Sequence, residues 1–150
     1  MIVLFSVNIA EGGNRKVLPY VKNCLKKASR EGAIDAALCA GRADLLIVPR
    51  GAEPRAEADY LLLAGGQQPR PGDRALRCGL GGGDALTLSS IGEDRAMLAL
   101  QASIHTLNGA VLEPQEIPVA LAAPAEPEAV LAAASAMLLL GADAQQGLKL

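Results

Sequence analysis

A continuous apolar run, residues 44–49 (DLLIVP), constrains the fold of this chain more than any other feature. A strand with one face in water alternates apolar and polar side chains, whereas an unbroken run is typical of a strand buried on both faces, as in a parallel sheet. A second such run, residues 60–63 (YLLL), follows a stretch rich in glycine, proline and charge. These two runs predict an α/β fold with a parallel sheet.

The rest of the first half fits the same architecture. Residues 16–30 predict a helix, because apolar side chains recur at spacings of three, four and seven and Pro19 falls in the first turn, where proline is tolerated. Further short strands are predicted at residues 2–7, 34–39 and 74–78. We therefore expect a Rossmann-like, mostly parallel sheet over residues 1–78.

After Cys78 the pattern changes to antiparallel pairing. Partial alternation of apolar and polar residues predicts strands at residues 85–91, 95–106 and 111–121. Asn108-Gly109 is a strong hairpin signal. An antiparallel meander over about 84–121 is the expected result, with a helix over 101–107 as the alternative.

The last element is predicted to be a helix that begins near Pro127 and ends at Leu140, before Gly141. Proline suits the first helical position, and glycine suits the position just past the end. The helix is apolar nearly all round, so it should be buried on more than one side. One face of a sheet covers about half of such a helix, and large exposed apolar patches are rare in monomers. The remaining side must meet either the helix over 17–28, whose narrow apolar stripe covers only part of it, or other protein. We therefore expect residues 129–140 to form a homodimer contact or to bind another protein partner.

Composition excludes several function classes. The chain has 150 residues, which is the size of one α/β domain spanning 1–150, and a net charge of −2. It has no Trp, one Phe and two Tyr, so aromatic platforms for nucleic-acid bases are nearly absent and there is no strong nucleic-acid signal. His105 is the only histidine, which leaves too few ligands for a histidine-based zinc site and supports no catalytic triad.

The three cysteines, Cys24, Cys39 and Cys78, are widely spaced and form no CxxC motif. We expect reduced, partly buried thiols. The N-terminus lacks the basic region of a signal peptide, and the longest apolar run, 129–140, is too short to span a membrane. These features predict a cytoplasmic protein without a membrane span.

A glycine-rich loop is the candidate ligand site. It comprises Gly79, Gly81, Gly82, Gly83 and Asp84, and it follows a predicted strand. Glycines let backbone amides approach a phosphate. The loop does not match GxGxxG or a Walker A motif, and the next element is a predicted strand, so no helix N-terminus faces an anion. A tight turn without a ligand is therefore the competing interpretation.

The predicted first helix is strongly basic. Residues 15–30 contain six cations and no acid before Glu31: Arg15, Lys16, Lys22, Lys26, Lys27 and Arg30. Such a stripe can bind RNA or an anionic membrane surface, and it can equally be the solvated face of an amphipathic helix.

Three segments of the second half stand in a familiar order. They are ALRCGLGGGDALTLSSI (75–91), NGAVLEPQEIPVAL (108–121) and AVLAAASAMLLLGAD (129–143). Over residues 74–143 the chain resembles the end of the ATP-binding central domain of Mur-type ligases and folylpolyglutamate synthetases. The resemblance implies a strand, a glycine turn, a meander and a closing alanine-rich helix.

The chain departs from that family in the parts that perform catalysis. No phosphate-binding loop and no magnesium constellation is recognisable, and Ala125 and Glu126 stand where the family has a His-Asn pair. The sequence therefore favours a small, non-catalytic, Mur-ligase-like protein with a binding or assembly role and no cofactor. One alternative is a nucleotide- or anion-binding protein, a weak relative of the ATP-dependent ligases, that uses residues 79–84. A second is an RNA- or membrane-surface module that uses helix 15–30.

Overall fold

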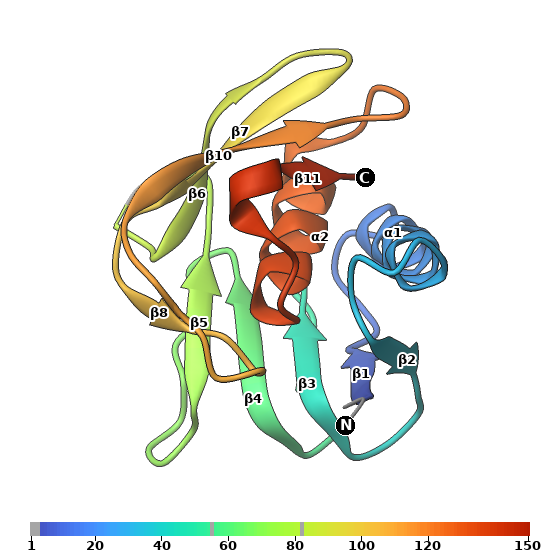
Figure 1. The fold of residues 1–150 in the computed structure, drawn as a ribbon. Helices are drawn as coiled ribbons and strands as arrows, with labels where there is room; N and C mark the ends of the chain where they lie inside the picture. Colours follow the sequence, from blue (N-terminus) through green and yellow to red (C-terminus); the bar gives the residue numbers. More distant parts are fainter. Residues whose placement is uncertain (1–3, 55, 82) are drawn as a thin grey trace.

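The computed structural model describes residues 4–54, 56–81 and 83–150. Nine strands form one sheet in the order β11-β10-β7-β6-β5-β4-β3-β1-β2, and two further strands form a small hairpin (Figure 1). The elements of the first half are β1 (Phe5–Ile9), α1 (Val17–Arg30), β2 (Ala36–Leu38), β3 (Ala43–Val48), β4 (Ala58–Ala64) and β5 (Ala75–Cys78). Those of the second half are β6 (Leu86–Ile91), β7 (Arg95–Leu100), β8 (Ile104–His105), β9 (Val111–Leu112), β10 (Gln115–Ala120), α2 (Pro127–Leu139), a 3-10 turn (Ala144–Gln146) and β11 (Leu148–Lys149).

The α/β fold class is confirmed. Strands β2, β1, β3, β4 and β5 are parallel, as the continuous apolar runs predicted. Strand β6 meets β5 at one parallel pair only, Cys78 with Leu86, and then pairs antiparallel with β7. Because the two strands touch only end to end, the short glycine-rich loop can join them without the helical crossover that parallel strands usually need.

The predicted meander is also confirmed, with one difference in its layout. Strand β7 pairs antiparallel with both β6 and β10 inside the main sheet. The Asn108-Gly109 turn closes a separate hairpin, in which Ile104 pairs with Leu112 and His105 with Val111. The alternative of a helix over 101–107 is wrong, because Ile104–His105 is a strand.

The larger apolar cluster contains residues of both helices. From the central strands it contains side chains that point toward the helices, such as Leu45, Ile47 and Leu62. The alternate residues, such as Leu46 and Leu61, belong to a second cluster that contains no helix residue. The described residues of segments 49–57 and 65–74 form no helix of the kind that a doubly wound fold has there, and Ala52 of the first segment packs on this side. Both helices therefore cover the same face of the sheet, and the main core lies between that face and the helices.

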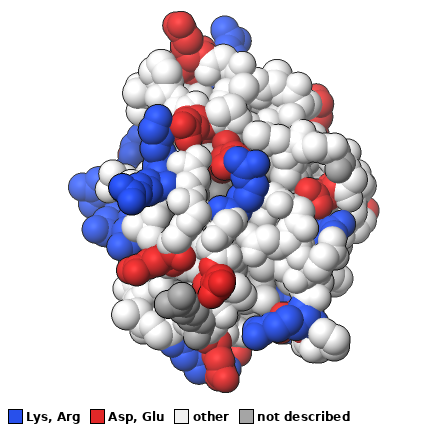
Figure 2. All heavy atoms as spheres, turned by 180° about the vertical axis from the view of Figure 1, so that it is seen from behind, with Lys and Arg blue, Asp and Glu red and all other residues white. Residues whose placement is uncertain are grey.

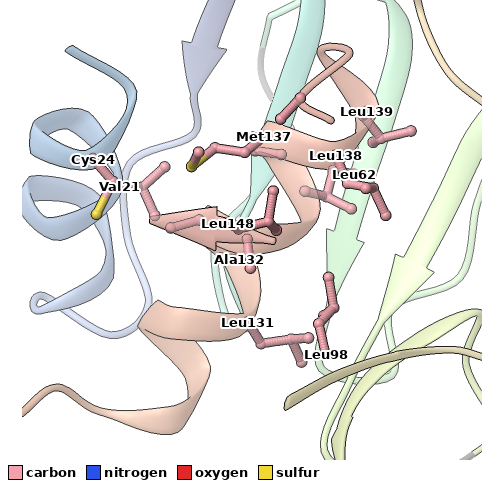
Figure 3. Close-up of a cluster of buried hydrophobic side chains, with 14 of the residues drawn as sticks. Val21, Cys24, Leu62, Leu98, Leu131, Ala132, Met137, Leu138, Leu139 and Leu148 are labelled. Carbon is pink, nitrogen blue, oxygen red and sulfur yellow. The ribbon is translucent and has the colours of Figure 1, made fainter. Parts of the chain in front are cut away.

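Helix α2 is buried along its whole length. Every residue from Ala129 to Leu139 is buried within this one chain. Figure 3 shows α2 side chains between α1, which contributes Val21 and Cys24, and the sheet, with Leu148 of β11 close by. The amide of Leu107 from the hairpin segment also donates to the Leu139 carbonyl at 2.8 Å. The second apolar side of α2 is thus covered by α1, β11 and the hairpin, which removes the reason for expecting a homodimer through residues 129–140.

Candidate functional site

A cavity of about 420 Å³ opens at the carboxyl ends of β3, β4 and β5. Its wall consists of residues that follow these strands and of one side of α2, where Leu131 and Ala132 line it. Ligands of open α/β sheets bind at this edge, and the volume falls in the range of small-molecule pockets. The cavity is therefore the candidate functional site.

Arg50 forms the rim of the cavity. Its Nη2 lies 2.7 Å from Oε1 of Glu128, in the first turn of α2. The stem of the same side chain passes over Gly65, where a Cβ would lie 2.5–2.6 Å from the arginine carbons. Glycine at this position thus allows the arginine to reach α2, and the pair links the end of β3 to the start of the helix.

The loop after β1 positions Arg50 from the other side. A Cβ on Gly13 would lie 2.1 Å from the carbonyl oxygen of Arg50, so only glycine permits this approach. Gly12 also forms an isolated antiparallel bridge with Ala52. The two loops are therefore packed backbone against backbone next to the cavity.

Asp84 is the most enclosed charged group of the cavity, with a side chain 13% exposed. Its carboxylate packs against Gly79, because a Cβ there would collide with Oδ2. Its Oδ1 lies 3.4 Å from Nε of Arg77. The Gln101 side chain donates to the Asp84 backbone carbonyl at 2.9 Å, which fixes the end of the loop.

Two backbone amides at this edge of the sheet, one of them at the start of the glycine-rich loop, are already hydrogen-bonded. The Gly79 amide donates to the Leu86 carbonyl at 3.0 Å, and the Gly65 amide donates to the Cys78 carbonyl at 3.1 Å. These amides hold the strands together and are not available to an anion. The Asp84 carboxylate also places negative charge where a phosphate would need donors.

Cys78 and Ser135 lie where β5 meets α2. Burial raises the pKa of the Cys78 thiol from its ordinary value of 9.0 to about 12, and the charge of Asp84 adds to the rise. Because its pKa is so high, the Cys78 thiol is protonated at neutral pH and is a poor nucleophile. The buried Ser135 hydroxyl lies beside this thiol and offsets part of the rise in its pKa, and no well-aligned hydrogen bond from the hydroxyl is found among the described residues.

A polar contact joins the starts of the two helices. The Asn14 side chain donates to Glu126 at 2.9 Å and to Glu128 at 3.4 Å, and Lys16 lies 3.2 Å from Glu126. The Asn14 amide and the Lys16 ammonium lower the pKa of Glu126. This contact holds the amino end of α2, and hence Glu128, beside the cavity.

The structure brings only part of the predicted site together. Gly79, Gly81 and Asp84 line the cavity, whereas Gly83 lines a separate hollow behind the loop, together with Arg77. Gly82 lies outside the described residues.

The cavity residues that were not predicted as site residues include four that shape its polar rim: Arg50, Gly65, Gly66 and Glu128. Three of them directly follow β3 or β4, so the strand-end rule that pointed to Asp84 could have found them as well. Glu128 comes from the opposite end of the chain, and no sequence signal connects it with Arg50.

Several other sequence expectations concern groups away from the cavity. All three cysteines are free, with Cys24 and Cys78 buried and Cys39 partly exposed. Within residues 4–54, 56–81 and 83–150, no three His, Cys, Asp or Glu side chains lie close enough to hold a metal ion. In the same ranges, neither helix has the length and apolar character needed to cross a membrane.

None of the protein-family models, curated proteins or solved structures compared with the chain matches it. The resemblance to the Mur-type ligases therefore stays a prediction, and the function has to be inferred from the geometry of the cavity.

Proposed function

We propose that this protein binds a small molecule that presents hydroxyl or amino donors and one apolar face, in the cavity at the ends of β3, β4 and β5. The position of Asp84 is the main support, because an enclosed carboxylate accepts hydrogen bonds and donates none. It selects ligands that carry donors and repels phosphate. A nucleoside is the simplest ligand that has both an apolar ring face and sugar hydroxyls.

The apolar face of such a ligand has a matching wall. Leu131 and Ala132 of α2, Val17 of α1 and Pro49 line the cavity beside the polar groups. Small-molecule sites commonly combine an apolar lining with a few convergent polar groups. A flat ring placed on this wall lies within the same cavity as the Asp84 carboxylate, which can then accept a hydrogen bond from a ligand hydroxyl.

The groups around the cavity favour binding over catalysis. Its two carboxylates are each paired with an arginine, Asp84 with Arg77 and Glu128 with Arg50. The Cys78 thiol, with its raised pKa, is not activated for attack. These pairings support a binding role without covalent chemistry.

A nucleotide held by its phosphates is the alternative that the same cavity raises. Among the described residues that line the cavity, Arg50 is the one cation, and it already forms an ion pair with Glu128. We therefore expect phosphates on a nucleoside to weaken binding.

Titration calorimetry with a panel of nucleosides, sugars and primary amines tests the proposal, with ATP and inorganic phosphate as comparators. Asp84→Asn should weaken binding of the best ligand about tenfold, which corresponds to about 1.4 kcal/mol. Asp73→Asn is the matched control, because Asp73 also pairs with an arginine, Arg70, but lies away from the cavity. Binding of inorganic phosphate or ATP in preference to the uncharged ligands would overturn the proposal, as would equal effects of the two substitutions.

A further inference from the structure

A second hollow lies at the edge of the sheet, between α1 and β2. It has a volume of about 680 Å³, and its lining includes Lys26 and Arg30 from the helix and Ala36 and Leu38 from the strand. In Figure 1, β2 is the outermost strand on the side of α1. We propose that this groove binds an extended acidic peptide segment of a partner protein, which adds to the sheet as a strand beside β2.

The backbone of β2 provides unused hydrogen-bonding groups. The strand pairs with β1 on one side only, where the Phe5 amide donates to the Asp35 carbonyl and the Cys39 amide donates to the Val7 carbonyl, both at 2.9 Å. In this register the backbone groups of Ala36 and Leu38 point the other way, toward the open edge.

One of these outward groups already has a partner, since the Ser29 hydroxyl donates to the Ala36 carbonyl at 2.8 Å. Among the described residues, the amides of Ala36 and Leu38 and the Leu38 carbonyl have none. An added strand supplies partners for such groups.

The charge of the groove indicates which peptide fits. Lys26, Lys27 and Arg30 line it, and Lys22 stands one turn earlier on the same helix. Figure 2 shows basic side chains gathered on the side of the molecule where α1 lies. Glu31 and Asp35 follow the helix in the sequence, and Lys27 already donates to the Leu150 carbonyl at 3.4 Å, so Lys26 and Arg30 are the lining cations that a peptide would meet.

The floor of the groove is apolar. Val7 and Leu25 are buried, and Leu38 is half-buried beside them. Successive side chains of an added strand point to opposite faces, so every second residue faces α1 and the floor. A peptide in which acidic and small aliphatic residues alternate can place carboxylates near the lysines and also cover apolar surface.

The groove favours a peptide over the other anionic partners of a basic helix. A membrane surface is flat and does not reach the backbone of β2 inside a groove. RNA phosphates accept hydrogen bonds but donate none, so they leave the Leu38 carbonyl without a partner. A peptide backbone alternates donors and acceptors at the spacing of a strand edge, which neither a phosphate backbone nor a membrane surface does.

Fluorescence anisotropy with a labelled peptide that alternates glutamate and valine tests the proposal on the full chain. The double variant Lys26→Glu/Arg30→Glu should weaken binding at least tenfold. The matched control is Arg15→Glu, a charge reversal of the same size at a residue outside the groove lining.

Two further variants separate strand addition from simple charge attraction. Ala36→Pro removes one outward amide and keeps the pairing with β1, so it should weaken binding several-fold, with the melting curve confirming a folded chain. A peptide methylated on alternate backbone nitrogens should lose binding.

Failure of the peptide to bind overturns the proposal, as does unchanged binding of the methylated peptide. Tighter binding of an RNA oligomer or of phosphatidylserine vesicles, lost in the same double variant, would replace it with a surface for those partners.

Discussion

Helices α1 and α2 cover the same face of the sheet but differ completely in their relation to solvent. Helix α2 has no charged side chain after Glu128 and is buried from Ala129 to Leu139. Helix α1 buries one stripe, which includes Val21 and Leu25, and exposes lysines on the rest of its surface. The first is a core element and the second is a boundary between core and solvent. Each helix also borders one of the two hollows, an acidic one at α2 and a basic one at α1.

The difference shows how a helix that is apolar on all sides can be fully buried within a chain of 150 residues. Three short segments complete the cover over α2: the stripe of α1, strand β11 and the segment around Leu107. None of them is long, yet each closes a side that the sheet leaves open. The apolar surface of α2 is therefore covered by the chain itself.

The largest contrast between the helices should appear when a leucine is truncated in each. Leu138→Ala in α2 removes a fully buried side chain and should cost about 2–5 kcal/mol of unfolding free energy. Leu18→Ala in α1, where the leucine is half-buried, should cost about 1 kcal/mol or less. Urea denaturation measures both values. Equal losses would show that α2 is not the core element described above.

Alkaline pH should act through the thiol that packs beside α2. The pKa of Cys78 is raised in the folded state, so folding favours the protonated thiol, and the stabilisation is lost as pH rises from 9 toward 12. The expected loss is at most about 1.4 kcal/mol for each pH unit in this window. Cys78→Ala should make the profile less steep, with the raised pKa values of Cys24, Tyr20 and Tyr60 accounting for the slope that remains, and Cys39→Ala is the comparison at a partly exposed thiol. Parallel profiles for all three proteins would contradict this assignment.

Replacing the glycine that follows each helix should also lower stability by different amounts. Gly141, after α2, has φ +98°, and a Cβ there would lie 2.5 Å from Nδ2 of Asn108. Gly32, after α1, has φ +78° and open space around it. Gly32→Ala should cost about 1 kcal/mol for the backbone alone, and Gly141→Ala should cost more because it also displaces Asn108. Thermal melting distinguishes the two, and a larger loss at Gly32 would contradict the tight packing at the end of α2.

Removing a serine hydroxyl should have the smallest effect on the unfolding free energy, and the effect should differ between the two helices. The buried Ser135 hydroxyl of α2 has only the weakly bonding Cys78 thiol beside it, so Ser135→Ala should leave the unfolding free energy unchanged or raise it by up to about 1 kcal/mol. The Ser29 hydroxyl of α1 donates to the Ala36 carbonyl, so Ser29→Ala should lower it by about 1 kcal/mol. A loss of stability in Ser135→Ala would indicate a hydrogen bond at that hydroxyl in solution.

The sequence predicted the elements well wherever a local pattern carries the information. The unbroken runs at β3 and β4 led to the parallel sheet, and Pro127 and Gly141 marked the ends of α2. Strand β11 was not expected, because Leu148–Lys149 is too short to show any periodicity. Its pairing with β10 depends on tertiary contacts alone.

The site was predictable only in part, for a related reason. Asp84 and the glycines around it were visible as a loop after a strand. The pairing of Arg50 with Glu128 joins residues far apart in the chain, and it exists because α2 packs across the ends of β3 and β4. The groove beside β2 is likewise a product of packing, although the basic residues of helix 15–30 were evident in the sequence.

The most direct test of the acidic cavity as a ligand site is an amide NMR titration with adenosine. Ligand in this cavity should shift the amide signals of Gly65, Gly66, Gly79 and Gly81 together, and leave those of Lys26 and Arg30 beside the other groove unchanged. The same titration of Asp84→Asn should need about ten times more adenosine for equal shifts. Shifts that gather on α1, or the absence of shifts at the four glycines, would contradict the proposed site.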